Sequence, residues 1–365
     1  MNDGFHSVRV DLGPRSYDIE IGSSNLSRAG AFLARRAGPT HAVLVTDANV
    51  EHPHATTVGE SLAQAEMAVD MLVVEAGEPS KSIDTAAALW EQLLQVGADR
   101  TSVVVAVGGG VVGDLAGFVA ATFARGLPLF QVPTTLLAQV DSSVGGKVGI
   151  NLPQAKNMVG AFLQPLGVLI DTATLATLEQ REYGSGLGEV VKYGVILDAE
   201  LFAYLEANAP ALVRRQYDVL RHVVARCCRL KADVVQQDEF EQTGRRAILN
   251  YGHTFGHAFE AVAGYGSLLH GEAVAMGMVC ASRLAERLGR IDAAVTARQV
   301  KLLAALGLPI RPPELDPDQV LDAMLHDKKV QHGRLRFVLP SRLGHVELVG
   351  GVDAEDVRAV LRDRA

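Results

Sequence analysis

The order of apolar and polar positions divides the chain into a strand-rich first half and a helical second half. The first half contains short, almost continuous apolar runs, which are typical of strands buried on both faces of a parallel sheet. These runs occupy residues 42–46, 68–74, 102–107 and 129–132. Helical patterns such as residues 83–96 separate them, which predicts a doubly wound α/β layer. Alternating polar and apolar positions at residues 7–12 and 17–21 predict an antiparallel pair at the edge of the sheet.

The second half is helical from about residue 174 nearly to the end of the chain. It contains long amphipathic patterns over residues 199–243, a proline-rich loop at 307–317 and a late hairpin. We therefore predict a Rossmann-like α/β domain over residues 1–178 and an all-α domain over residues 179–365.

Composition narrows the class of protein without identifying it. Of the 365 residues, 48% are hydrophobic and 21% are charged, which is ordinary for a globular protein. The net charge of −8 argues against a general nucleic-acid-binding surface. No apolar run approaches the ~20 residues of a membrane span, no signal-peptide layout opens the chain, and the three cysteines fit no disulfide framework. We expect a cytoplasmic protein with no nucleic-acid or membrane partner.

A glycine-rich turn follows the most strand-like run of the chain. Gly108, Gly110 and Gly113 match the pattern G-x-G-x-x-G after a strand and before a helix, where backbone N–H groups can approach a pyrophosphate. No acidic residue follows at the usual distance, but Asp47 ends an earlier strand and could accept hydrogen bonds from a ribose. Tight turns without a ligand would need the same glycines, so the motif alone leaves both interpretations open.

A second unusual stretch covers residues 141–160, shortly after Thr134 and Thr135, which are expected to cap a helix. It has too many turn residues for a regular element and too many charges for a plain linker. We therefore predict a functional loop, with an exposed loop of no function as the alternative. Its polar residues include Asp141, Lys147, Asn151, Lys156 and Asn157.

Three of the eleven histidines lie close together late in the chain. His253, His257 and Glu260 are spaced at i, i+4 and i+7, so they share one face of a helix, and His270 begins a second apolar helical run. Imidazoles presented by two helices could hold a metal ion. Hydrogen-bonded histidines in a helical core would produce the same pattern.

Lysine is scarce, with only eight among the 34 basic residues. Arginine therefore supplies the routine surface charge, and the lysines are expected where a compact ammonium group is required. Lys147 and Lys156 lie in the glycine-rich stretch, and Lys192 follows Glu189 by three positions on one predicted helix face. A coding bias would leave lysines at random positions, so we favour an anion-binding role.

Several longer motifs occur in order between about residues 75 and 339, and they resemble the 3-dehydroquinate synthase family. They read GGGVVGD, PTTLLAQVDSSVGGKVGIN, SGLGEVVKYG, LNYGHTFGHAFE and LHGEAVAMGM, followed by a late DKK. The resemblance implies an NAD- and zinc-dependent enzyme that converts 3-deoxy-D-arabino-heptulosonate 7-phosphate to 3-dehydroquinate and phosphate in the shikimate pathway. It also implies transient oxidation at C5, loss of phosphate, re-reduction and an intramolecular aldol closure.

The same resemblance assigns roles to individual residues. It implies that zinc or cobalt is held by Glu189, His253 and His270, so that His257 becomes a neighbour of the metal rather than a ligand. Substrate-binding or catalytic roles are implied for Asp141, Lys147, Asn157, Lys192, Lys231, Arg246, Asn250 and His257, with one of Lys328 and Lys329. NAD contacts are implied for Asp47, Glu78, Lys81, Gly109, Gly110, Val111, Val112, Gly113, Asp114, Thr134, Thr135, Lys147, Lys156, Thr174 and Thr177.

Three other classes of protein are compatible with parts of this pattern. Another sugar phosphate cyclase would share the mechanism and differ in a few substrate-facing residues. An NAD-dependent metal alcohol dehydrogenase would share the two-domain layout but has no use for so many cations. A non-catalytic NAD- or metal-binding protein would not need the complete set of metal, lysine and glycine positions. The resemblance further implies an anionic sugar phosphate as the substrate and a homodimer as the assembly.

Overall fold

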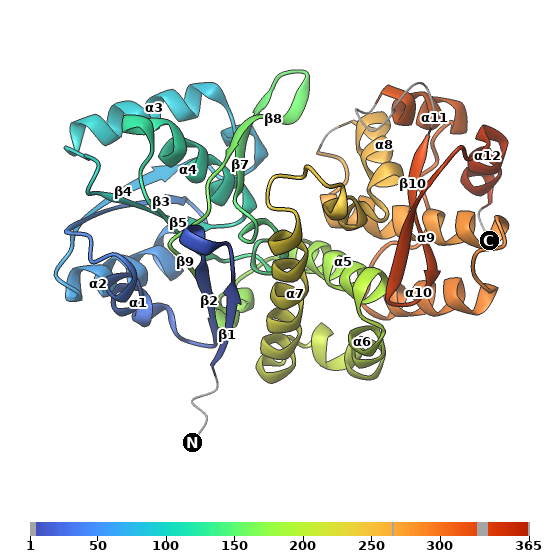
Figure 1. Cartoon of the computed structure of the whole chain (residues 1–365), viewed down its shortest axis with the longest axis horizontal. Helices are drawn as coiled ribbons and strands as arrows, with labels where there is room; N and C mark the ends of the chain where they lie inside the picture. Colours follow the sequence, from blue (N-terminus) through green and yellow to red (C-terminus); the bar gives the residue numbers. More distant parts are fainter. Residues whose placement is uncertain (1–4, 265, 327–334, 364–365) are drawn as a thin grey trace. The chain divides into compact units, whose positions relative to one another are not determined.

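The computed structural model describes residues 5–264, 266–326 and 335–363. The chain folds into two compact units (Figure 1). The described residues up to Leu178, together with Leu220–Phe240, form the α/β unit. Glu179–Val219 and the described residues from Glu241 onward form the helical unit. The single boundary expected after residue 178 is therefore incomplete, because a segment assigned to the second domain returns to the first.

The α/β unit is built on one seven-stranded sheet. Its strands lie in the order β1 (His6–Val10), β2 (Tyr17–Gly22), β9 (Gly167–Asp171), β6 (Leu129–Pro133), β5 (Val103–Gly108), β3 (His41–Asp47) and β4 (Ala68–Val74). All neighbouring strands are parallel except β1 and β2, which are antiparallel at one edge. The predicted parallel layer and the predicted antiparallel edge pair are both confirmed.

Helices cover both faces of this sheet, because successive residues of a strand point to opposite sides. The helices are α1 (Ala29–Arg36), α2 (Thr56–Gln64), α3 (Ile83–Gln95) and α4 (Gly110–Thr122). In β3, Val43 and Val45 pack in the apolar cluster that contains α3 and α4, whereas Ala42 and Leu44 pack in the cluster that contains α1 and α2. Figure 1 shows the two helix pairs on opposite sides of the sheet.

The stretch predicted as a loop over residues 141–160 is mostly an antiparallel hairpin, so that prediction is wrong. Its strands are β7 (Lys147–Leu152) and β8 (Ala155–Phe162). Gly149 pairs with Gly160, and a Cβ atom on Gly149 would lie 2.7 Å from the carbonyl oxygen of Val159. The glycines made a regular element look unfavourable in the sequence. In the structure they permit the backbones of β7 and β8 to approach each other closely.

The helical unit surrounds one buried helix, α9 (His270–Arg287), whose middle residues are inaccessible to solvent. A two-stranded sheet completes the unit and corresponds to the late hairpin predicted from the sequence. The other elements are α5 (Gln180–Leu197), α6 (Ala199–Val213), α8 (His253–Ala263), α10 (Ala293–Ala305), α11 (Pro317–His326), β10 (Arg336–Arg342), β11 (His345–Gly350) and α12 (Ala354–Arg362).

Helix α7 (Tyr217–Gln237) begins in the helical unit, but from Leu220 onward it belongs to the α/β unit. Among the described residues, no helix combines the length and the apolar character needed to cross a membrane.

Candidate functional site

Three potential metal ligands converge in the helical unit, although they come from three different helices. Glu189 lies in α5, His253 begins α8 and His270 begins α9. The Nε2 atoms of His253 and His270 lie 3.7 and 3.8 Å from the same oxygen, Oε1 of Glu189. Ligand atoms around a tetrahedral zinc ion lie roughly 3.3 Å apart, given bonds of about 2.0–2.2 Å. The three atoms are therefore spaced for sharing one ion rather than for hydrogen bonding.

The carboxylate of Glu189 is a fully buried charge. Its Oε2 forms an ion pair with Nζ of Lys192; otherwise neither oxygen accepts a hydrogen bond from the described part of the chain. Burying a carboxylate without adequate partners costs several kcal/mol. A divalent ion between Oε1 and the two imidazoles would offset this cost, so the residues present fit a metal.

In each of the two imidazoles, Nε2 faces Glu189 and the other ring nitrogen, Nδ1, has a polar partner. Nδ1 of His253 donates a hydrogen bond to the carbonyl oxygen of Tyr251 at 3.1 Å, and Nδ1 of His270 lies 3.4 Å from Oε2 of Glu260. These contacts favour the tautomer that presents Nε2 as an acceptor, as metal-binding histidines require. Burial lowers the pKa of His270, but Glu260 and Glu189 raise it, and the pKa ends above its ordinary value. Metal binding there competes with protonation of the imidazole.

Glycines allow α5 and α9 to approach closely enough for this geometry. A Cβ atom on Gly188 would lie 2.7 Å from the carbonyl oxygen of Gly271, and a Cβ atom on Gly271 would overlap the carbonyl oxygen of Ser185. The backbone N–H of Gly271 also donates to Oγ of Ser185 at 3.0 Å. Because Gly188 precedes Glu189 and Gly271 follows His270, the closest approach of the helices brings these two ligands together.

Helix α8 meets α9 in the same way. A Cβ atom on Gly256 would lie 3.1 Å from the backbone of Ala273, and one on Gly252 would lie 2.9 Å from the carbonyl oxygen of Val274. Gly252 has a φ of +80°, in the left-handed region, and directly precedes His253. The glycines were visible in the sequence, but nothing in their spacing indicated which helices they would join.

His257 lies beside this cluster. Its ring centroid is 5.4 Å from that of His253 and 5.9 Å from that of His270. His257, Glu260 and His270 form a second group whose potential ligand atoms lie within 4.8 Å of one another. The sequence placed Glu260 on the helix face of the histidines but gave it no role, and its contact with His270 was missed. Its position three residues after His257 was the available signal.

The other candidate substrate contacts of the helical unit are mostly buried. Lys192 is 1% exposed beside Glu189. Arg246 is 3% exposed, with its Nε 3.6 Å from Oε1 of Glu241. Asn250 ends the short helix η8 (Arg245–Asn250), three residues before His253. The candidates Lys328 and Lys329 lie outside the described residues.

In the α/β unit, the glycine turn separates β5 from α4. Gly109 is the residue before the helix, and a Cβ atom there would lie 2.9 Å from Cγ2 of Thr135. A Cβ atom on Gly110 would lie 3.2 Å from Oγ of Ser142. Within the described chain no side chain caps this helix, so its first N–H groups can receive an anionic group. They belong to Gly110, Val111 and Val112, whereas the N–H of Gly113 already donates to the carbonyl oxygen of Gly109 at 3.0 Å.

The parallel sheet brings Asp47 and the glycine turn to the same edge, although they are far apart in the sequence. Thr46 in β3 pairs with Val107 in β5, so Asp47 and Gly108 follow at the same edge of the sheet. Burial raises the pKa of Asp47, although the N–H of Asn49 donates to its Oδ1 at 2.9 Å. Asp47 precedes the glycines in the sequence. It nevertheless lies at the sheet edge where dinucleotide-binding units usually carry an acidic residue that follows the glycines in the sequence.

The threonines assigned to this edge are largely engaged within the unit. Thr134 follows β6, and Oγ1 of Thr135 accepts a hydrogen bond at 3.2 Å from the N–H three residues later, so the predicted capping role is confirmed for Thr135. Thr174 is 2% exposed, and its hydroxyl donates to a backbone carbonyl at 2.8 Å. Oγ1 of Thr177 lies 2.8 Å from Nε2 of His54, whose pKa is lowered by burial.

A buried lysine links the hairpin formed by β7 and β8 to helix α4, which follows the glycine turn. Lys81 is 4% exposed, and its Nζ donates to Oδ2 of Asp114 in α4 at 2.7 Å and to Oδ1 of Asn157 in β8 at 2.5 Å. Nδ2 of Asn151 donates to Oε1 of Glu78 at 2.7 Å. Burial raises the pKa of Asp114, and Lys81 opposes that rise. The amide of Asn157, assigned to substrate by resemblance, is therefore engaged with a residue assigned to NAD.

Lys231 lies in the α/β unit, not with the other helices of the second half. Its Nζ donates to Oδ1 of Asp141 at 2.7 Å and to the carbonyl oxygen of the same residue at 2.6 Å. Asp141 belongs to the short helical segment η6 (Ala138–Ser142). Lys147 begins β7 and is exposed, and Lys156 lies in β8 and is partly buried.

The two units carry the parts of one recognisable class of enzyme. The α/β unit has a glycine turn at the carboxyl edge of a parallel sheet, which is typical of dinucleotide binding. The helical unit brings together one carboxylate and two imidazoles, which are residue types and a number of ligands that suit a catalytic metal ion. Buried lysines and an arginine are suited to an anionic substrate. This combination is typical of enzymes that use a dinucleotide and a divalent ion.

Comparison with known sequences identifies the family within that class. Residues 71–185 match the 3-dehydroquinate synthase N-terminal family, and residues 186–330 match the 3-dehydroquinate synthase C-terminal family. A 3-dehydroquinate synthase from Rhodopirellula baltica is 50% identical over 99% of this chain and 98% of its own length. The chain belongs to the 3-dehydroquinate synthase family.

Solved structures of related cyclases share the whole fold. A 2-deoxy-scyllo-inosose synthase complexed with carbaglucose-6-phosphate, NAD⁺ and Co²⁺ has a TM-score of 0.88 and 28% identity, with 99% of this chain and 100% of that chain covered. A 2-epi-5-epi-valiolone synthase from Streptomyces hygroscopicus, with NAD⁺ and Zn²⁺ bound, has a TM-score of 0.87 and 30% identity, with 96% and 97% covered.

Proposed function

We propose that this protein is a 3-dehydroquinate synthase, a carbon–oxygen lyase that converts 3-deoxy-D-arabino-heptulosonate 7-phosphate to 3-dehydroquinate and inorganic phosphate. The convergence of Glu189, His253 and His270 carries the proposal, because it supplies the divalent-ion site that this chemistry requires. The 50% identity to the Rhodopirellula baltica synthase, against 28% and 30% to the inosose and valiolone synthases, supports this substrate over theirs.

The proposed cofactors are NAD⁺ and either Zn²⁺ or Co²⁺. Glu189, His253 and His270 would hold the ion, and the start of α4, Asp47 and the turn ending at Lys81 would hold the dinucleotide. When bound, the ion supplies Lewis acidity at a substrate hydroxyl, and NAD⁺ supplies a reversible hydride acceptor. Cobalt or zinc both suit a site of one carboxylate and two imidazoles.

The side chains of the chain itself would bind and orient the substrate. Lys192 and Arg246 in the helical unit, and Lys147 and Lys231 in the α/β unit, are proposed to hold its carboxylate and phosphate. Fixing both anionic groups would orient the reacting carbon atoms between them, which contributes more to the rate than binding alone. The phosphate of the substrate is proposed to accept the C6 proton, so the protein need not supply a strong general base.

We also infer that the enzyme is cytoplasmic and forms a homodimer. The cysteine usage, in which the buried Cys227, Cys228 and Cys280 form no disulfide, is compatible with a reducing cytoplasm. The family resemblance favours a homodimer.

The direct test is a phosphate-release assay on the heptulosonate phosphate, with sedoheptulose 7-phosphate assayed alongside. We expect phosphate release from the first substrate with catalytic amounts of NAD⁺ and no net accumulation of NADH at 340 nm. Stoichiometric NADH formation from a simple polyol would instead support a metal alcohol dehydrogenase. Preferential turnover of sedoheptulose 7-phosphate would support a sister cyclase.

The lysines should separate substrate binding from cofactor binding. We expect Lys147→Ala and Lys192→Ala to weaken substrate binding roughly 10- to 100-fold, because each removes a charge-assisted contact worth about 1.5–3 kcal/mol. Isothermal titration calorimetry should show a much smaller change for NAD⁺. Equal losses for both ligands would contradict the assignment of these two lysines to the substrate.

A further inference from the structure

Helix α7 carries the proposed substrate contact Lys231 together with a set of polar contacts that no catalytic role explains. From Leu220 onward it belongs to the α/β unit, although the chain before it and the chain after Phe240 belong to the helical unit. Its contacts along its own length, rather than its direct chain connections, therefore attach it to the α/β unit. Those contacts decide whether Lys231 stays beside Asp141.

One face of α7 meets the segment η6. Nζ of Lys231 binds both the carboxylate and the carbonyl oxygen of Asp141, and Sγ of Cys228 lies 3.2 Å from the carbonyl oxygen of Gln139. Cys228 and Lys231 are three positions apart, so they lie on the same side of the helix. Lys231 is only 6% exposed, which makes the position of its ammonium group sensitive to the position of the whole helix.

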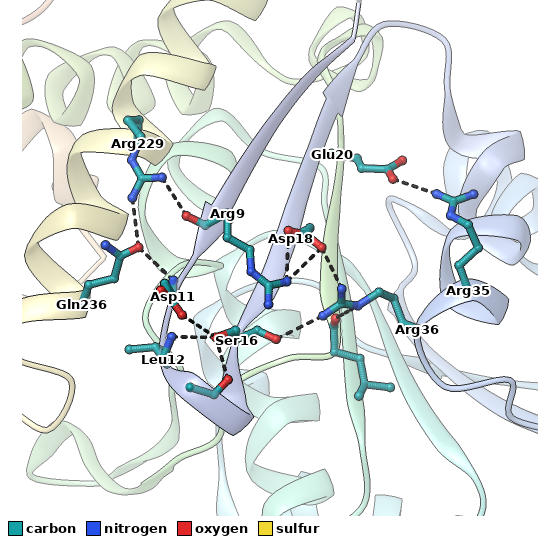
Figure 2. Close-up of polar contacts among 12 residues, drawn as sticks. Arg9, Asp11, Leu12, Ser16, Asp18, Glu20, Arg35, Arg36, Arg229 and Gln236 are labelled. Atoms are coloured by element: carbon teal, nitrogen blue, oxygen red, sulfur yellow. Dashed lines mark hydrogen bonds and ion pairs between the residues drawn. The ribbon is translucent and has the colours of Figure 1, made fainter.

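A neighbouring face of α7 is bonded to the region of the edge strand β1, as Figure 2 shows. Nη1 of Arg229 donates to the carbonyl oxygen of Arg9 at 2.7 Å. Oε1 of Gln236 accepts from the N–H of Asp11 at 2.8 Å and from Nη2 of Arg229 at 3.0 Å. Arg229 and Gln236 are two helical turns apart, so together they set both the rotation and the axial position of α7 against the strand.

The segment that directly follows α7 is held by a bidentate ion pair. Nε and Nη2 of Arg15, in the short helix η1 (Gly13–Arg15), lie 2.9 and 2.7 Å from the two carboxylate oxygens of Glu239. The Arg15 guanidinium also lies 5.5 Å from the ring centroid of Phe240. Paired charge-assisted bonds of this kind specify geometry as well as affinity.

We propose that Arg229, Gln236 and Glu239 are positioning residues for Lys231. They lock α7 to β1 and to η1, so that Lys231 and Asp141 move as one substrate-binding pair within the α/β unit. Apolar burial also holds α7, but burial is non-directional and does not by itself set the register of a helix. The substrate-binding part of this inference rests on the proposed function, whereas the locking of α7 rests on the contacts alone.

The test is the double variant Arg229→Met with Gln236→Leu in the full-length protein, because it removes the polar lock and retains most of the side-chain volume. We expect acetic anhydride to modify Lys231 about tenfold faster, as measured by peptide mass spectrometry, because α7 opens more often. We also expect the KM for the heptulosonate phosphate to rise about tenfold, with kcat changed less and the Kd for NAD⁺ unchanged.

Matched controls separate this lock from a general loss of stability. Arg9→Met removes the ion pair of the Arg9 side chain with Asp18 but keeps the Arg9 carbonyl that accepts from Arg229, so Lys231 should react at the parent rate. The single variant Gln236→Glu keeps an acceptor oxygen at this position, so its Lys231 should be modified as slowly as that of the parent. If the double variant does not fold, Glu239→Gln should give smaller changes in the same directions.

The outcomes are distinguishable. Unchanged Lys231 reactivity in the folded double variant, or in Glu239→Gln if that variant is used, would overturn the lock. Faster modification of Lys231 with an unchanged KM would overturn the link between the lock and substrate binding. A parent protein that releases no phosphate would overturn the proposed function, while the modification rates would still decide whether the lock exists.

Discussion

Glu189→Gln is expected to remove bound metal and abolish phosphate release while leaving the fold intact. Glu189 is fully buried, and the change removes its negative charge and replaces one of the two carboxylate oxygens by an NH2 group, which cannot bind a metal ion. Replacing residues that only support metal ligands costs about 10- to 100-fold in metal affinity, so the loss of a ligand should exceed about 100-fold. Equilibrium dialysis against Zn²⁺, with far-UV circular dichroism as the check on folding, measures both effects.

The control for this variant is Glu260→Gln. Glu260 contacts Nδ1 of His270 and is not one of the three converging ligands, so its loss should fall within the range of about 10- to 100-fold. Treatment of the parent with a chelator should reproduce the inactive state and be reversed by added Zn²⁺, whereas Glu189→Gln should not recover at the same concentration. Full activity in Glu189→Gln, or in the metal-stripped parent, would reject the metal site.

Gly271→Ala should damage both stability and metal affinity, because it adds an atom where α9 touches α5. The new Cβ would overlap the carbonyl oxygen of Ser185 and lie 2.7 Å from its Oγ. The contact is with backbone, so one helix must shift, and overpacking of this kind typically costs about 1–3 kcal/mol. A shift of α9 also carries His270 away from Glu189. Denaturant unfolding and zinc dialysis should both report a loss.

Gly184→Ala is the matched control, since Gly184 also lies inside α5. A Cβ atom there would meet nothing within 4 Å, so the substitution adds no clash. Alanine is favoured over glycine in a helix by about 1 kcal/mol, so this variant should be slightly more stable and bind zinc normally. If both variants lost stability and metal equally, close packing between α5 and α9 would not be what aligns the ligands.

Local patterns predicted most elements of the α/β unit correctly, because each strand and helix carries its own periodicity. The continuous apolar run before Gly108 is a buried strand, and the alternation over residues 7–12 and 17–21 corresponds to β1 and β2. The hairpin formed by β7 and β8 was missed, because Gly149 and Gly160 are poor strand residues in isolation. Their use becomes apparent only when the two backbones face each other.

The candidate site shows the same limit. Spacing correctly indicated that His253 and His257 share a helix face, but a periodicity within one helix carries no information about residues in another. Glu189 faces His270 because Gly188 and Gly271 permit contact between α5 and α9. The family resemblance implies that ligand set, whereas spacing along the chain does not.

The sequence by itself determined the periodic elements, the glycine turn and the residue types from which a metal- and anion-binding site could be made. These are local properties, set by neighbours within a few positions along the chain. Only the tertiary structure decided that Asp47 joins the glycine edge, that Lys231 returns to the α/β unit beside Asp141, and that one carboxylate and two imidazoles meet. Those relations depend on strand order and on the approach of backbones at glycines, which arise only when distant segments pack together.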